Sequence, residues 1–169
     1  MPRQGRIDSP GALHHVIVRG IERRRIFQDG QDRNRFVDRL GTILSETATP
    51  CYAWVLLRNH LLLRTGSVPI ATMTRRLLTD YAVTYNRRHH RHGHLFQNRY
   101  KSVLRQEEPY LLDLVRYIHL NPLRAKIVLT LADLDSYPYA GHRFVLGKGG
   151  SSWQDVDTVL SHFGGYMKP

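Results

Sequence analysis

The sequence contains a single cysteine, few acidic residues and no long apolar run. Because Cys51 has no second cysteine to join, an internal disulfide and a zinc site built from cysteines are both excluded. We expect Cys51 to be a buried apolar residue of a protein from a reducing compartment. No apolar run approaches the ~20 residues of a membrane span, and the opening residues do not form the apolar segment of a signal peptide. These absences predict a cytoplasmic protein that does not enter a membrane.

The shortage of acidic residues leaves a large positive charge. Lysine and arginine total 25 against 14 aspartates and glutamates, which gives a formal net charge of +11. Folding does not require such an excess, so we expect a polyanionic partner. Arginine dominates the excess, and its planar guanidinium donates two hydrogen bonds to one phosphate, which favours nucleic acid over a membrane surface. A basic protein without such a partner is the alternative that charge alone leaves open.

The pattern of apolar residues predicts one domain of mixed structure. A length of 169 residues with 41% hydrophobic content allows one ordinary core and a short appendage. Four apolar runs predict strands over 13–18, 51–57, 60–64 and 99–106. The second and third runs are separated by Arg58-Asn59, which predicts a β-hairpin with a tight turn. Three segments with apolar spacings of three and four residues predict helices: 31–47, 73–85 and 109–121.

This order of elements is compatible with a ferredoxin-like α+β fold, in which an antiparallel sheet carries helices on one face. Other α+β folds fit the pattern as well. After Val128 the sequence becomes irregular until a short amphipathic helix over 153–163. We therefore expect a main domain over 1–128 and a C-terminal extension over 129–169 that is irregular apart from this helix.

Three residues have side chains suited to phosphoryl transfer. Tyr117 stands one residue before a core position of the third helix, so we expect its hydroxyl at the edge of the buried face. It is either a nucleophile or an ordinary residue at the rim of the core. His60 opens the second strand of the hairpin, on the same side as Leu62, and is either a metal ligand or a structural histidine. Asn121 follows Tyr117 by four residues, so on a continuing helix both would share one face. Asn121 is either a cation ligand or the residue that ends the helix before Pro122.

Basic residues gather in several short clusters that predict a nucleic-acid surface. Three aromatic residues, Tyr85, Phe96 and Tyr100, lie among them and are candidates to stack on unpaired bases. Solvated helix and loop faces are the alternative interpretation. The candidate nucleic-acid-binding residues are Arg23, Arg24, Arg25, Arg75, Arg76, Arg87, Arg88, Arg91, Arg99 and Lys101.

Longer strings of this sequence are particular enough to be compared with known families. The most distinctive are Gly93-His94-Leu95-Phe96-Gln97-Asn98-Arg99-Tyr100-Lys101-Ser102 and Tyr117-Ile118-His119-Leu120-Asn121-Pro122-Leu123-Arg124-Ala125. Pro10-Gly11-Ala12-Leu13-His14-His15-Val16, Arg19-Gly20-Ile21-Glu22-Arg23-Arg24 and Asn59-His60 add to them. With these strings, residues 6–163 resemble the REP-associated tyrosine transposases, a branch of the single-tyrosine HUH (IS200-like) transposase family.

The resemblance implies a ferredoxin-like catalytic domain over 1–128 that acts on hairpin-bearing single-stranded DNA with a divalent metal, Mg²⁺ or Mn²⁺. A tyrosine of such a domain attacks the DNA and becomes joined to the 5′ phosphate, and the released 3′ hydroxyl can reverse the step. By position, Tyr117 matches the nucleophile and His60 the first histidine of the HUH motif. Asn121 matches the polar residue that completes the metal site.

One position departs from the family pattern. Where the second histidine belongs, this sequence has Leu62, which cannot coordinate a metal, and loss of one ligand weakens metal binding by orders of magnitude. His14 and His15 on the first strand are the candidate replacements, whereas His119 is expected to point to another side of the helix than Tyr117. Three functions stay open: an active transposase, a DNA-hairpin-binding protein that no longer cuts, and an RNA-binding protein. A monomer and a homodimer fit equally well.

Overall fold

The computed structural model describes residues 10–57, 60–64, 66–97, 100–105 and 110–164, and for 60–64 and 102–105 it describes the backbone only. The expected hairpin turn at Arg58-Asn59 and the candidate residue Arg99 lie outside the described residues. About half of the described residues are helical, and the others form strands and loops. The expected mixture of helix and strand is confirmed.

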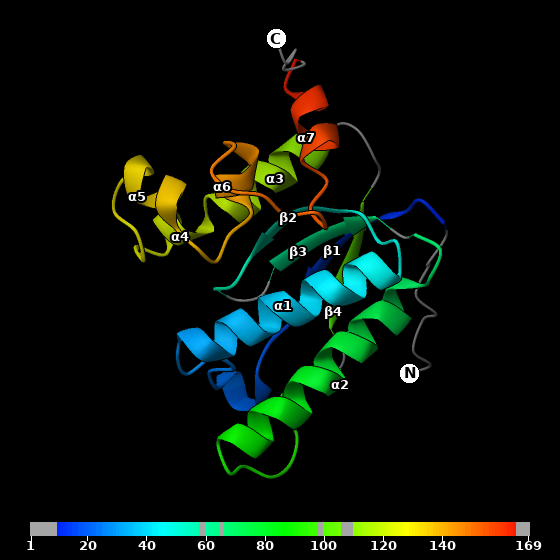
Figure 1. Cartoon of the computed structure of the whole chain (residues 1–169), viewed down its shortest axis with the longest axis vertical. Helices are drawn as coiled ribbons and strands as arrows, with labels where there is room; N and C mark the ends of the chain where they lie inside the picture. Colours follow the sequence, from blue (N-terminus) through cyan, green and yellow to red (C-terminus); the bar gives the residue numbers. More distant parts are fainter. Residues whose placement is uncertain (1–9, 58–59, 65, 98–99, 106–109, 165–169) are drawn as a thin grey trace.

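Four strands form one sheet: β1 (Leu13–Ile17), β2 (Cys51–Val55), β3 (His60–Arg64) and β4 (Lys101–Arg105). Their order across the sheet is β2-β3-β1-β4, and every neighbouring pair is antiparallel (Figure 1). The predicted pairing of β2 with β3 is confirmed. All five residues of β2 are buried, so the apolar run over 51–55 is explained by a strand that is covered on both faces. Cys51 is fully buried, as expected, and this burial raises the pKa of its thiol.

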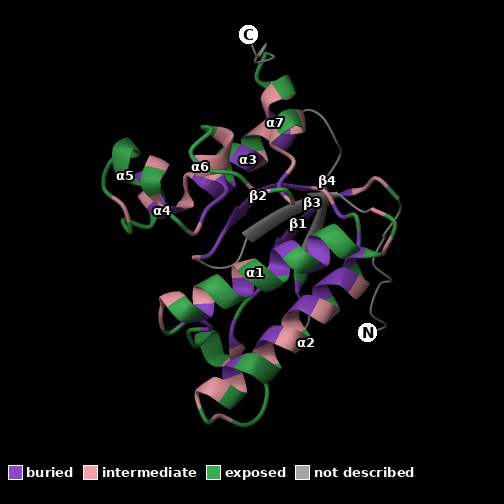
Figure 2. Ribbon diagram, viewed as in Figure 1, coloured by how far each residue is buried: buried purple, intermediate pink, exposed green. Residues whose placement is uncertain are grey.

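Two long helices cover one face of the sheet. Helices α1 (Gly30–Glu46) and α2 (Ile70–Arg88) pack against each other and against the sheet, with their buried residues turned toward it (Figures 1 and 2). The carboxylate of Asp29 accepts a hydrogen bond from the Asp32 N–H and caps α1. The core on this face includes Val16, Phe36, Leu40, Trp54 and Tyr81.

Helix α3 (Leu111–His119) covers the opposite face, so the expectation that all helices lie on one face is wrong. Its residues Leu111, Val115 and Ile118 form a core cluster with Ala53 and Val55 of β2. The periodicity of α3 indicates an apolar side, but it does not say which face of the sheet that side meets. Because both faces of β2 are apolar, both must be covered.

The segment after residue 128 is more regular than its composition predicts. It contains α5 (Leu131–Ser136) and α6 (His142–Val145) as well as the expected last helix, α7 (Val156–His162). The segment runs along the free edge of β2, where Ala140 pairs with Val55 and the indole N–H of Trp54 donates to Gln154 at 2.9 Å. Among the helices that the structure describes, none is long and apolar enough to span a membrane.

Candidate active site and nucleic-acid interface

Tyr117 lies on α3 at the rim of the core, where the sequence places it. Its side chain is 40% exposed, while the next residue, Ile118, is fully buried. The phenol ring meets the ring of His15 on β1 edge to face, with centroids 6.1 Å apart and an interplanar angle of 77°. Contact between α3 and the sheet therefore brings an accessible phenol beside an imidazole.

The strand register relates Tyr117 to the two positions of the expected metal motif. His60 is aligned with Val55 on β2 and with Ile17 on β1, and Leu62 is aligned with Ala53 and His15. Directly opposed residues of antiparallel strands share a face of the sheet. Since Ala53 and Val55 pack against α3, positions 60 and 62 belong to the face that carries Tyr117.

The two histidines of β1 fall on different faces of the sheet. His15 contacts Tyr117 on the α3 face. His14 alternates with it along the strand and shares a face with Val16, which belongs to the core under α1 and α2. Of the two candidate replacements for the missing ligand, only His15 is therefore beside the tyrosine.

Asn121 keeps the four-residue spacing from Tyr117 on a nearly continuous helix. It begins the short helix α4 (Asn121–Arg124), and Leu120 links this helix to α3 because its N–H donates to Arg116 and its carbonyl accepts from Arg124, at 2.9 and 3.0 Å. The side-chain Nδ2 of Asn121 is buried, and no hydrogen-bond partner for it is found among the described residues. Helix α3 ends before Pro122, as expected, and Pro122 lies in the first turn of α4, where no N–H is required of it.

Arg124 is a site residue that the sequence did not reveal. Its guanidinium carbon lies over the Tyr117 ring, 5.3 Å from the centroid. Arg124 follows Tyr117 by seven residues, which is two turns of a helix. This spacing predicts a contact only if α3 and α4 form a nearly continuous helix, and the sequence alone did not indicate that they do. A cation on the ring of a candidate nucleophile is well placed to meet a phosphate.

His119 points away from this site, as expected. It is 3% exposed and its ring lies 5.8 Å from that of His142 on α6. Burial, together with the nearby His142, lowers the pKa of His119 to about 3. His119 is therefore a neutral packing residue between α3 and the C-terminal segment.

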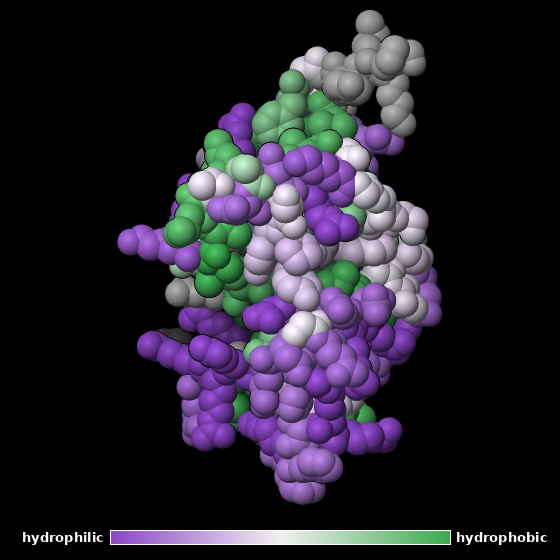
Figure 3. Space-filling view, turned by 60° about the vertical axis from the view of Figure 1, so that its left-hand side comes forward, coloured by the Kyte–Doolittle hydropathy of each residue, from purple (hydrophilic) through white to green (hydrophobic). Residues whose placement is uncertain are grey.

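The basic candidates divide into exposed and internally paired residues. Arg23, Arg24 and Arg25 are exposed in the loop around the single 3₁₀ turn η1 (Ile21–Arg23). Lys101 is exposed at the start of β4, and Arg76 pairs with Glu46. In Figure 3 hydrophilic side chains gather over the lower part of the molecule, where Figure 1 places this loop and the C-terminal end of α2.

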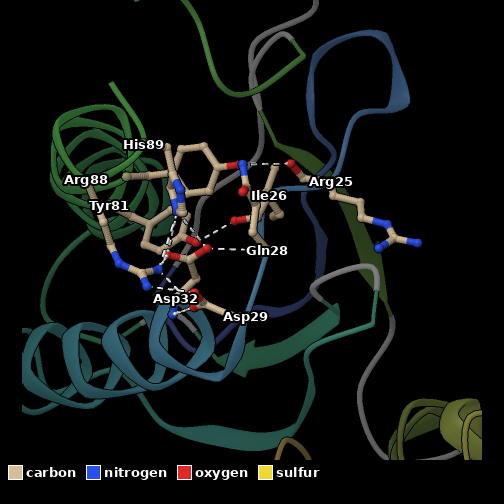
Figure 4. A network of polar contacts seen from close by, with 9 residues as sticks. Arg25, Ile26, Gln28, Asp29, Asp32, Tyr81, Arg88 and His89 are labelled. Carbon is tan, nitrogen blue, oxygen red and sulfur yellow. Dashed lines mark hydrogen bonds and ion pairs between the residues drawn. The ribbon is translucent and has the colours of Figure 1, made fainter. Parts of the chain in front are cut away.

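Arg88 is taken up by an internal network rather than by open surface (Figure 4). Its guanidinium contacts the carboxylates of Asp29 at 2.6 Å and Asp32 at 2.5 Å, and His89 lies 2.9 Å from Asp32. Burial raises the pKa of Asp32, but the Gln28 N–H and the hydrogen bonds of His89 and Arg88 outweigh it and lower this pKa. The network fastens the end of α2 to the start of α1.

Comparison with known proteins supports the fold at a general level. No protein-family model matches the sequence, and no match was found among the curated proteins. Among solved structures, the chain is similar to a REP-associated tyrosine transposase bound to a REP hairpin, with a TM-score of 0.72 and 15% sequence identity. The similarity covers 88% of this chain and 87% of that chain. At this identity, the likeness concerns the fold.

Proposed function

We propose that this protein binds DNA hairpins and cuts the adjoining single strand with Tyr117, in the manner of a single-tyrosine transposase. The setting of Tyr117 carries the proposal: its ring is partly exposed and contacts both the imidazole of His15 and the guanidinium of Arg124. The similar solved structure holds a REP hairpin. The formal charge of +11 supports a partner of this kind.

The proposal includes a ferredoxin-like catalytic domain over 1–128. The succession of β1, α1, β2, β3, α2 and β4, with the strand order β2-β3-β1-β4, supports this class. Helix α3 then adds a layer on the opposite face and carries the nucleophile.

A divalent cation, Mg²⁺ or Mn²⁺, is part of the proposed site, and when bound it would polarise the scissile phosphate. Asn121 suits such a site because its side-chain oxygen is a ligand that these cations accept, and it stands four residues after Tyr117. His60 would supply one imidazole, and His15, aligned with Leu62, would supply another. Because Leu62 has no donor atom, we expect weak binding that favours Mn²⁺ over Mg²⁺.

The reaction follows from the groups around the phenol. The oxygen of Tyr117 forms a bond to phosphorus as the bond from phosphorus to the 3′ oxygen breaks, and the phenol proton ends on the released 3′ hydroxyl. Arg124 offsets the negative charge that gathers on the phosphate. Because one phosphate ester replaces another, the 3′ hydroxyl can attack the phosphotyrosine and reverse the step.

A covalent trapping experiment tests this function. Single strands with a hairpin and a 3′-end label are incubated with the protein and Mn²⁺, and then denatured. A labelled protein band is expected for the wild type and none for Tyr117→Phe. Failure of the wild type to form an adduct with Mg²⁺ or Mn²⁺, while it still binds the hairpin, would exclude cleavage.

A second candidate function is hairpin binding without cleavage, which the leucine at position 62 favours. In that case Leu62→His, which places an imidazole two residues from His60, is expected to create adduct formation that the wild type lacks. A variant that binds Mn²⁺ more tightly but still forms no adduct would contradict an explanation based on the lost ligand alone.

A further inference from the structure

A cavity of about 710 Å³ opens beside the η1 loop and has an unusual lining. Five arginines reach it, and none of the described residues that line it is acidic. Apolar side chains, among them Ile26, Phe27 and Leu56, form another part of its wall. Its size is that of a small-molecule site, and its chemistry combines anion donors with an apolar surface. The arginines are Arg19, Arg23, Arg24, Arg25 and Arg33.

The loop that carries all of these arginines except Arg33, which lies on α1, is held in a strained form. Glu22 and Arg23 have positive φ angles of 52° and 59°, which residues other than glycine rarely adopt. Gly20 is required before them, because a Cβ atom there would lie 2.1 Å from the Arg24 carbonyl oxygen. The Ile21 N–H donates to the Leu95 carbonyl at 2.9 Å and fixes the loop. Such maintained strain is typical of binding sites.

Arg33 adds a guanidinium stacked on aromatic rings to the wall of the cavity. Its guanidinium lies over the rings of Phe27 and Tyr139, at 5.9 and 5.4 Å from their centroids. Its Nε is buried, and no hydrogen-bond partner for it is found among the described residues. The stack holds the guanidinium at the wall of the cavity, where a cation suits an anionic group of a ligand.

The cavity lies where the site-bearing elements end. Arg19 follows β1 two residues after Ile17, the register partner of His60. Leu57, another lining residue, follows the last residue of β2 by two positions. Ile127, which also lines the cavity, follows the helix that contains Asn121. The cavity therefore lies at the end of the sheet where β1 and β2 end, next to the segment that follows α4.

We propose that the cavity binds one unpaired nucleotide of the DNA strand next to the scissile phosphate. Its base lies against the apolar wall and its phosphate meets the loop arginines, with Arg33 donating to the base or sugar. This subsite would read the strand outside the hairpin and so set the position of the cut. The inference rests on the proposed function, because it requires that single-stranded DNA reach Tyr117.

Abasic scanning of a hairpin with unpaired flanks tests the subsite. Affinities are measured by fluorescence anisotropy as each flanking nucleotide in turn loses its base. For the wild type, one position is expected to weaken binding ~10-fold, the effect of losing one stacked base. Arg33→Gln and Arg25→Gln are expected to abolish this dependence, whereas Arg35→Gln, an exposed arginine on the same helix, is expected to retain it.

The outcomes separate the subsite from the proposed function. Hairpin binding and adduct formation without dependence on any flanking base would overturn the subsite and leave the function intact. Equal dependence in the wild type, Arg33→Gln and Arg25→Gln would also overturn it. Absence of hairpin binding by the folded wild type would overturn the proposed function and the subsite together. Circular dichroism spectra of all variants establish that they are folded.

Discussion

At the scale of single residues, Arg124 has the most direct test. Its guanidinium stacks on Tyr117, so Arg124→Gln is expected to slow adduct formation at least ~10-fold through loss of charge stabilisation at the phosphate. Hairpin affinity is expected to change much less. Single-turnover kinetics with saturating DNA separate the two effects.

Helix α3 offers a matched control for this experiment. Arg116 is exposed on the same helix and interacts with Asp113 and with the Phe163 ring, away from Tyr117. Arg116→Gln is expected to leave the rate unchanged, and Arg124→Lys, which keeps the charge, to recover part of it. Equal slowing by Arg116→Gln and Arg124→Gln would show that Arg124 has no particular role.

His119 gives the folded protein a dependence on pH. Its pKa falls to about 3 in the folded chain from an ordinary value of 6.5, so between these values the unfolded chain binds a proton that the folded chain does not. Its contribution to stability is therefore complete above pH 6.5 and declines as the pH falls. The slope is at most ~1.4 kcal/mol per pH unit.

Urea unfolding of the wild type and His119→Phe at pH 7 and pH 5 measures this contribution. Phenylalanine keeps an aromatic ring against His142 but does not titrate. The variant is expected to lose less of its free energy of unfolding on acidification than the wild type does. Identical losses would show that His119 is not responsible for the pH dependence.

At the scale of secondary-structure elements, the contact between α1 and α2 depends on Arg88. Removing this guanidinium leaves Asp32, whose side chain is 2% exposed, with one cationic partner fewer. Arg88→Met is therefore expected to lower the free energy of unfolding, because the carboxylate of Asp32 loses the guanidinium that it accepts from. The neighbouring Arg87 is exposed, and Arg87→Met is expected to change it by no more than ~0.5 kcal/mol. Urea unfolding curves of both variants at pH 7 test this difference.

The elements could be predicted from local patterns, and their arrangement only in part. Alternation and helical spacing indicated the strands, α1, α2 and α3. Helix α5 was missed although Thr130 and Asp133 form a capping box, a signal that was available in the sequence. The face that α3 covers could not be derived, because its periodicity is the same for either face.

The candidate site, like the fold, could be predicted from the sequence only where it depends on local spacing. Tyr117 and Asn121 stand four residues apart across the nearly continuous junction of α3 and α4, so local spacing was enough to relate them. The contact of His15 with Tyr117 joins a strand to a helix about a hundred residues away, and depends on the strand register. Arg88 was expected on the nucleic-acid surface, but the carboxylates that it binds lie on a distant helix end.

At the scale of the whole molecule, the net charge of +11 predicts salt-sensitive binding. Each phosphate contact releases counterions, so the affinity for a DNA hairpin is expected to fall linearly on logarithmic axes as salt rises. Arg23→Gln is expected to reduce the slope by about 1. Anisotropy titrations at several salt concentrations measure both slopes. A matched RNA hairpin that binds more tightly than DNA at every salt concentration would favour the RNA-binding alternative.

The central claim is that the phenol of Tyr117 becomes joined to DNA. Mass spectrometry of the protein after reaction with a hairpin-bearing single strand and Mn²⁺ tests it most directly. We expect an added mass equal to the strand 3′ of the cut, located after proteolysis on the peptide that contains Tyr117. An adduct on a different residue, or unmodified protein together with intact bound DNA, would contradict it.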